Sequence, residues 1–416
     1  MMAAPATTTI GSYPVFPSGE DVDYYQKMLE KGLGAEVTDP FLWSIEESVN
    51  DFAAAGIQVL STGQTRGDLY SLFLDPRFVR GIEWDGPLAV VKGKLSRTSS
   101  IRLPDLEFAG SVAPAHLAFK EPITDAYTLA RFAKISTGSY RDTRELARDI
   151  NRKIVIPELE DIQRVRAAEM VQLDSPNIAA ESTTPDYIRG LYEEVASAAK
   201  IPVVLHVCGD TTRLFRFLTS LKVDALELDF FHYPRLTDEA ARRNFDQRIG
   251  LGVLDAQSPR VESVEEIASL IRRGTKSLGE DRIGWVHPHC GQRSLHRETA
   301  FEKNSNMTMA RDDVFFGEAE EPRVLKPRES RRARGHFLVS VKRETGEIVV
   351  TFYSANRRVL KRLRSKFTEP LLRAIEDDAG SLHLDRKQVA LLMLELGRAE
   401  ASLKKETVAF RQRLTL

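Results

Sequence analysis

Cysteine is nearly absent from this 416-residue sequence, which contains only Cys208 and Cys290. Two cysteines cannot form a disulfide framework, and reduced thiols are typical of the cytosol, so we expect a cytoplasmic protein. Residues 1–9 lack the basic start and the long apolar stretch of a secretory signal, which agrees with that expectation.

Long hydrophobic runs and an excess of one charge are also missing. No run approaches 18 apolar residues, so the sequence predicts no membrane span. The 59 basic and 60 acidic residues leave a formal net charge of −1, which argues against nucleic acid or an anionic membrane as a partner. The hydrophobic share of 42% is that of an ordinary globular protein.

Short apolar runs alternate with amphipathic stretches through the first three quarters of the chain. The runs predict eight strands, at residues 7–12, 58–62, 116–120, 170–174, 203–208, 223–230, 248–254 and 282–287. Helical patterns lie between them, for example at 184–199 and at 263–278, where Ser263 and Glu266 have the spacing of a capping box. Repeated strand–helix alternation predicts an α/β fold, a (β/α)8 TIM barrel. Residues 86–95 and 97–106 are predicted to form an extra hairpin after the second strand.

The composition changes near residue 312, and we predict a barrel over 1–312, a linker over 313–334 and a small α+β domain over 335–416. The linker is rich in charge and contains two prolines. In the last domain, residues 336–343 and 347–353 alternate as a hairpin would, and two helices are expected at 357–377 and 385–407. Its basic runs are interpreted as solvated faces rather than a docking surface.

The strongest local feature is the stretch Val-Val-Leu-His-Val-Cys-Gly-Asp at residues 203–210. His206 and Cys208 lie two residues apart on a strand, so both side chains face the same way, at the end of a barrel strand where such enzymes place their chemistry. Cys290 follows the last predicted strand. The next strand after Cys208 carries Glu227 and Asp229 on one face, which is unusual for a buried strand unless the carboxylates meet a cation. One imidazole, two thiolates and one carboxylate would complete a zinc site.

Each of these residues has a simpler explanation when taken alone. A single cysteine is more often a small buried apolar residue than a ligand, and a histidine is often part of a core. Glu227 could pair with an arginine. A structural zinc finger would need close cysteine pairs, which the sequence lacks. Because all the candidates fall at the same end of the predicted strands, we favour the metal site.

Several ordered motifs carry a resemblance to a known family. They are Thr-Thr-Thr-Ile-Gly-Ser-Tyr-Pro at 7–14, Gly-Gln-Thr-Arg-Gly-Asp at 63–68, Val-Gln-Leu-Asp-Ser-Pro at 171–176, His-Val-Cys-Gly-Asp at 206–210, Ser-Pro-Arg-Val-Glu-Ser-Val-Glu-Glu at 258–266 and Pro-His-Cys-Gly at 288–291. Over residues 7–309 the chain resembles the catalytic barrel of cobalamin-independent methionine synthases, in their short single-barrel form. The C-terminal region resembles, more weakly, an accessory domain of methyl-transfer proteins.

The resemblance implies a zinc ion as cofactor, with His206, Cys208 and Cys290 as ligands. The fourth ligand of the family, a Glu near the end of the following strand, corresponds to Asp229, with Glu227 as the nearby alternative.

The resemblance also implies an amino-acid substrate. The family holds that substrate with backbone that corresponds here to Ile10, Gly11 and Ser12, and with carboxylates that pair its ammonium group. Asp174 corresponds to one of these carboxylates. Gln64 stands where the long enzymes have the other, so this chain carries one charge fewer at the expected ammonium site.

Two departures from the long enzymes concern the methyl donor. The chain has no room for their additional N-terminal half, which helps to hold a folate. Gln257 also replaces their histidine in the Asp-Ile-His-Ser-Pro segment, which is expected to protonate the departing folate nitrogen. Both departures favour a methylated corrinoid, carried by a separate protein, as the donor. In the alternative, His232 or His289 supplies the missing acid.

The sequence therefore predicts a zinc-dependent methyltransferase that converts homocysteine to methionine. Within the enzyme class, the alternative is a related zinc thiol alkyltransferase that uses another thiol or an epoxide. In another class, the alternative is a zinc-stabilised barrel that acts as a scaffold for a partner. Asp174 is not among the predicted zinc ligands, and its presence argues against an inert barrel.

Overall fold

The computed structural model describes residues 4–34, 37–136, 138–180 and 186–317, together with the backbone of three later strands. By their contacts, residues 1–16 and 44–327 form one unit, and residues 17–43 and 328–416 form a second. None of the helices in the described residues is long and apolar enough to cross a membrane.

A parallel eight-stranded sheet forms the centre of the first unit, in the order β1-β11-β10-β9-β8-β7-β5-β2. Its strands are β1 (Ala6–Thr7), β2 (Val59–Leu60), β5 (Ala118–Thr124), β7 (Ala168–Asp174), β8 (Val203–Val207), β9 (Ala225–Asp229), β10 (Arg248–Leu254) and β11 (Ile283–Pro288). A parallel bridge between Thr8 and Val59 joins the two ends of this order. The Thr8 hydroxyl strengthens the junction by donating to the Val59 carbonyl at 2.8 Å. The sheet is therefore closed, and the predicted barrel is confirmed.

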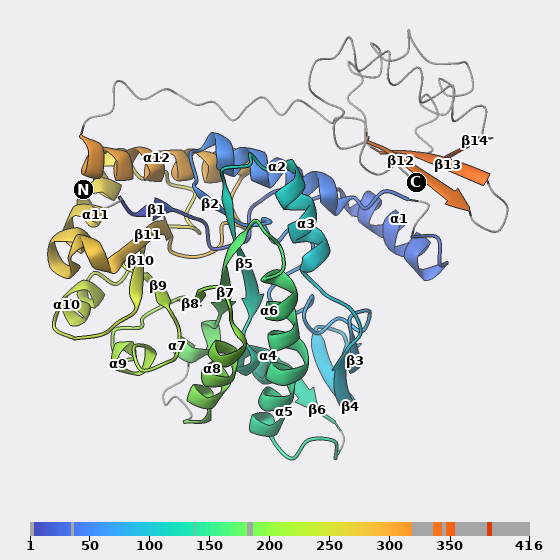
Figure 1. Ribbon diagram of the computed structural model, residues 1–416, viewed down its shortest axis with the longest axis horizontal. Helices are drawn as coiled ribbons and strands as arrows, with labels where there is room; N and C mark the ends of the chain where they lie inside the picture. Colours follow the sequence, from blue (N-terminus) through green and yellow to red (C-terminus); the bar gives the residue numbers. More distant parts are fainter. Residues whose placement is uncertain are drawn as a thin grey trace, which may run out of the picture. The chain divides into compact units, whose positions relative to one another are not determined.

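Helices that follow the strands flank this sheet (Figure 1). They are α2 (Phe41–Ala54), α4 (Ala126–Phe132), α5 (Thr143–Ile150), α6 (Ile156–Ile162), α7 (Pro176–Ala180), α8 (Tyr187–Ala198), α9 (Phe215–Leu218), α10 (Arg235–Ala241), α11 (Val264–Leu278) and α12 (Arg297–Phe316). A π-helical turn, η2 (Asn151–Val155), joins α5 to α6, and a 3-10 turn, η3 (Glu280–Arg282), precedes β11. The predicted capping box is present at the start of α11, because Ser263 and Glu266 each accept a backbone N–H of the other.

All eight predicted barrel strands are present, but their ends differ from the prediction. β5 continues to Thr124, whereas an apolar run stops at Lys120. Lys120 and Glu121 both lie inside the strand, where their side chains are fully buried against charged partners, Glu227 and Arg102. A charged pair of this kind interrupts the hydrophobic pattern without interrupting the strand.

The predicted position of the extra hairpin was wrong. Its strands are β3 (Val79–Asp85) and β4 (Leu88–Arg97), which together with β6 (Ala133–Ile135) form a separate three-stranded sheet. The hairpin turns at Gly86-Pro87, where Gly86 has a φ of +58° that glycine adopts without strain. Residues assigned to the second predicted strand instead begin the helix α3 (Leu103–Val112), with Pro104 in its first turn.

The second unit contains the helix α1 (Gly19–Glu30) and the antiparallel sheet β12-β13-β14. Strands β12 (His336–Lys342) and β13 (Glu347–Tyr353) confirm the predicted hairpin, and β14 (Ser381–Leu384) adds a third strand that the sequence did not predict. The turn of that hairpin and the predicted helices at 357–377 and 385–407 lie outside the described residues.

Candidate active site and metal centre

Three predicted metal ligands come together at the carboxyl ends of the barrel strands. His206 is near the end of β8, Cys208 directly follows β8, and Cys290 follows β11. The His206 Nε2 lies 2.8 Å from the Cys208 Sγ, which lies 2.9 Å from the Cys290 Sγ. Although β8 and β11 are not neighbours in the sheet, barrel closure makes their ends converge.

The electrostatics of these side chains suit a metal ion. Burial lowers the pKa of His206 well below its usual value, so its imidazole is neutral and can act as a ligand. Contact with Cys290 is the largest cause that raises the pKa of the Cys208 thiol, and burial adds to it. The same contact lowers the pKa of the Cys290 thiol, and a cation beside the pair would relieve the repulsion between two thiolates. An imidazole and two thiols converging in this way form a donor set typical of zinc.

The two candidate carboxylates have different surroundings. Asp229 ends β9 and accepts hydrogen bonds from the backbone N–H of His232 at 2.9 Å and, at its other oxygen, from the His232 Nδ1 at 2.9 Å. With His232 and His289 it forms a second group of potential ligand atoms, separate from the first. Its charge is among the smaller causes that raise the pKa of Cys208. Glu227 instead pairs with Lys120 and accepts from the Trp285 Nε1 at 2.5 Å, deeper in the barrel.

The predicted amino-acid site lies around Asp174, at the end of β7. The carboxylate is 3% exposed, and its two oxygens accept from the Nε2 of Gln172 at 2.6 Å and from that of Gln64 at 3.4 Å. Burial raises the pKa of Asp174 to about 7, which the two amide donors only partly oppose. The site therefore holds one carboxylate that a cation would return to its ionised form.

The segment that follows β1 completes this site. The Ile10 carbonyl accepts from the Gln172 Nε2 at 2.7 Å, so Ile10 and Asp174 share one amide. Gly11 has a φ of +129°, and a Cβ there would lie 2.7 Å from the Gln64 Oε1, so no other residue fits. The Ser12 carbonyl accepts from the backbone N–H of Gln292, two residues after Cys290. The structure thus brings Ile10, Gly11, Ser12, Gln64 and Asp174 together.

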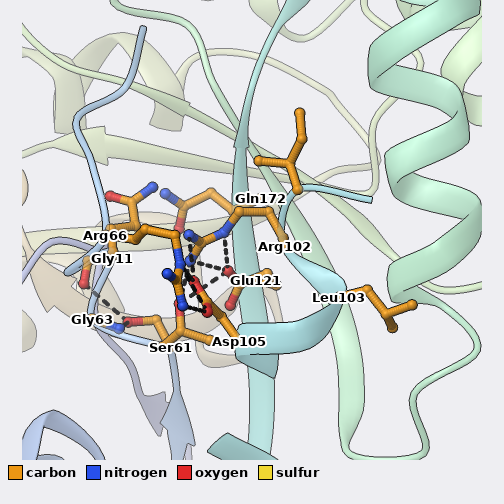
Figure 2. Close-up of polar contacts among 12 residues, drawn as sticks. Gly11, Ser61, Gly63, Arg66, Arg102, Leu103, Asp105, Glu121 and Gln172 are labelled. Carbon is orange, nitrogen blue, oxygen red and sulfur yellow. Dashed lines mark hydrogen bonds and ion pairs between the residues drawn. The ribbon is translucent and has the colours of Figure 1, made fainter. Parts of the chain in front are cut away.

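A buried charge network that the sequence did not predict supports this corner of the site (Figure 2). Arg102 donates to Glu121 through Nε at 2.6 Å, and Thr62 donates to the same carboxylate at 3.0 Å. Arg66 forms a two-pronged pair with Asp105, which also lies 3.5 Å from Arg102. Because Thr62 and Arg66 flank Gln64 in the chain, the network anchors the loop that carries it. The only sequence signal was a charged residue in the middle of a strand.

We expect Glu121→Gln to destabilise the protein strongly, because it removes the nearer of the two carboxylates that pair with the buried Arg102 guanidinium. Breaking a buried pair typically costs about 3–5 kcal/mol. Urea unfolding followed by tryptophan fluorescence would measure the change. The matched control is Glu194→Gln, which removes the half-exposed partner of Arg152 and should cost less than about 1 kcal/mol. Equal losses in the two variants would contradict the expectation.

Gln257 and two histidines lie at the carboxyl ends of the barrel strands, on the side where the methyl donor is expected to bind. Gln257 is exposed, in the loop after β10, and its backbone N–H donates to Asp255 at 2.9 Å. The same Asp255 lies 3.4 Å from the Nε2 of His232 and 3.7 Å from the Nδ1 of His289. The structure therefore places both alternative acids beside the loop that carries the glutamine.

Comparison with known proteins identifies the family. Residues 5–312 match the family described as cobalamin-independent synthase, catalytic domain. The chain belongs to this family. It is 30% identical over 311 residues to a methionine synthase of Methanothermobacter thermautotrophicus, a match that spans 73% of this chain and 98% of that protein. A methionine synthase of Methanocaldococcus jannaschii is 28% identical over 319 residues, or 73% of this chain and 97% of that protein.

Solved structures agree with the fold. A B12-independent methionine synthase from Shewanella sp. W3-18-1, solved with selenomethionine, aligns with a TM-score of 0.61 and 18% identity over 75% of this chain and 98% of its own. A methyltransferase from Methanosarcina mazei aligns with a TM-score of 0.51 and 13% identity over 76% of this chain and 95% of its own. The cobalamin-independent methionine synthase family is one of methyltransferases, and this chain is an enzyme of that type.

Proposed function

We propose that this enzyme methylates the thiol of homocysteine, giving methionine, at a zinc site formed by His206, Cys208, Cys290 and Asp229. The observation that carries the proposal is the convergence of one imidazole and two thiols within hydrogen-bonding distance of one another. Of the two carboxylates, Asp229 is favoured, because Glu227 is already engaged by Lys120 and Trp285.

The proposal gives each part of the site a separate role in substrate binding or methyl transfer. When bound, zinc would supply the charge that keeps a substrate sulfur in its thiolate form at neutral pH. Asp174 would pair with the ammonium group of the amino acid. The backbone from Ile10 to Ser12 would lie beside the substrate, because the Ile10 carbonyl accepts from Gln172 near Asp174 and the Ser12 carbonyl accepts from Gln292 near Cys290. In the overall reaction, the thiol loses its proton, and its sulfur bonds to the methyl carbon as the donor departs with the electron pair of the broken bond.

The donor we favour is a methylated corrinoid, bound as a substrate and carried by a separate protein. A cobalt(I) corrinoid departs without being protonated, whereas a folate nitrogen requires an acid. Gln257 stands at the loop where the family's acid is expected, and an amide cannot serve as one. His232 supports a second candidate, methyl-folate, since its side chain is 38% exposed and lies beside the same loop.

The test offers homocysteine with methylcobalamin and, separately, with methyl-tetrahydrofolate, and measures the methionine formed. We expect turnover with the corrinoid, and at least about 10²-fold less with the folate, the usual contribution of general acid catalysis. Cys208→Ser, run in parallel, corrects for any reaction that occurs without the site. Folate turnover on the order of 1 s⁻¹ in the unmodified protein would reverse the choice of donor.

Three further points complete the proposal. Within the enzyme class, the alternative remains a related thiol alkyltransferase that uses another thiol as acceptor or an epoxide as electrophile. We propose a barrel over 1–312, a linker over 313–334 and a small α+β domain over 335–416. The helix α12 ends at Phe316, so it extends into the first residues of the proposed linker. The cytoplasm is the proposed location, because both cysteines are free thiols.

A further inference from the structure

Gln172 occupies a position between the two halves of the amino-acid site. It precedes Asp174 by two residues on β7, so both side chains face the barrel interior. The Gln172 side chain is fully buried, and its Nε2 donates both to the Asp174 Oδ1 at 2.6 Å and to the Ile10 carbonyl at 2.7 Å. A single amide nitrogen therefore hydrogen-bonds both the Asp174 carboxylate and the Ile10 carbonyl and holds the two acceptors close together.

The orientation of this amide is fixed by its partners. Both of its neighbours are acceptors, so a reversed amide would bring its oxygen against two other oxygens. In the observed orientation the Gln172 Oε1 is buried without a hydrogen-bond partner among the described residues. The two hydrogen bonds that the Gln172 side chain makes among the described residues are therefore both donated by its nitrogen.

The second amide at this site is a poorer support for Asp174. Gln64 reaches the other carboxylate oxygen only at 3.4 Å, and it has a φ of +44°, the only positive φ at a residue other than glycine in the described part of the chain. Gln64 therefore contributes little to fixing the carboxylate, and Gln172 is the main hydrogen-bonded support of Asp174.

We propose that Gln172 is a positioning residue that sets Asp174 and the Ile10 carbonyl together as acceptors for the ammonium group of the amino-acid substrate. An ammonium group has three donors and no acceptor, so it needs several oxygens gathered around one point. The proposal rests on the proposed function, because it assumes that the thiol substrate carries an amino group.

The test compares homocysteine with 4-mercaptobutanoate, the same thiol acid without the amine. In Gln172→Met, which keeps the side-chain length but cannot donate, the KM for homocysteine should rise at least 10-fold. The KM for 4-mercaptobutanoate and the zinc content should change less than 2-fold. A merely structural role would shift both KM values together.

Gln247 offers a matched control. Its Nε2 also donates to two backbone carbonyls, those of Thr219 and Leu221, both at 3.1 Å, and its Oε1 is likewise buried without a partner, far from Asp174 in the chain. Gln247→Met should leave the ratio of the two KM values unchanged. If Gln172→Met is not recovered folded, Gln172→Asn, whose amide is one methylene too short to reach, carries the same expectation.

The outcomes separate the two proposals. If the unmodified enzyme prefers homocysteine and Gln172→Met retains that preference, the role of Gln172 is wrong and the proposed function stands. If the unmodified enzyme uses both thiols equally well, the amino-acid substrate and the role of Gln172 are both wrong.

Discussion

Replacing either cysteine with serine should remove most of the zinc from the protein. Cys208 and Cys290 supply both sulfur atoms of the donor set, and their Sγ atoms lie 2.9 Å apart. A serine hydroxyl is not ionised near neutral pH, so each change removes one of the charges that hold the ion. Elemental analysis of the purified variants, together with methionine formation, would measure the loss, and we expect about one zinc per chain in the unmodified protein.

A histidine variant away from the site controls for nonspecific loss of zinc. His296 is exposed, directly before α12, and His296→Gln should retain full zinc content, whereas His206→Gln should not. Circular dichroism would show whether each variant folds. Full zinc retention in both cysteine variants would exclude the metal site as we propose it.

Asp174→Asn should raise the KM for homocysteine by roughly 10²-fold, because truncating one member of a buried charge pair typically costs 2–5 kcal/mol. Zinc content should not change, since the Asp174 carboxylate accepts its hydrogen bonds from Gln172 and Gln64 and from none of His206, Cys208 and Cys290. Steady-state kinetics with homocysteine and 4-mercaptobutanoate would separate loss of ammonium binding from general damage. An unchanged KM for homocysteine would exclude Asp174 from the substrate site.

The same carboxylate gives the unmodified enzyme a predicted pH dependence. Because burial raises the pKa of Asp174 to about 7, the free enzyme carries a protonated, neutral Asp174 below that pH and cannot pair it with an ammonium group. The kcat/KM for homocysteine should therefore fall as the pH drops through 7. For 4-mercaptobutanoate, which has no amine, Asp174 should contribute no such fall.

Residue types and motifs were sufficient to predict which side chains come together at the carboxyl ends of the strands, and their roles as ligands and substrate contacts stay predictions. His206, Cys208 and Cys290 are uncommon residues at strand ends, and barrel closure brings strand ends together. The carboxylates of β9 were expected to meet a cation, and Glu227 does so, although its partner is Lys120 rather than an arginine.

Other features depend on geometry that a linear pattern does not contain. Asp229 is oriented by His232 through the tight turn after β9, and sequence alone does not predict that turn. Gln172 resembles any polar residue in a strand until its amide is seen to reach both Ile10 and Asp174. The second half of β5 was not predicted, because Lys120 and Glu121 interrupt the apolar pattern and the residues that neutralise them lie elsewhere in the chain.

The barrel seam between β1 and β2 has a consequence for how residues 10–12 are held in place. β1 and β2 are each two residues long, and only one bridge, Thr8 to Val59, joins them. Every other junction in the barrel has at least two paired residues, so this seam relies on side chains: the Thr9 Oγ1 donates to the Ser61 Oγ at 3.1 Å, and the Ser61 Oγ donates to the Gly11 carbonyl at 3.0 Å. Residues 10–12 follow directly from it. The segment proposed to bind the substrate is thus held at the seam by side-chain hydroxyls, whereas Asp174 is carried by a strand that is paired along its length on β5.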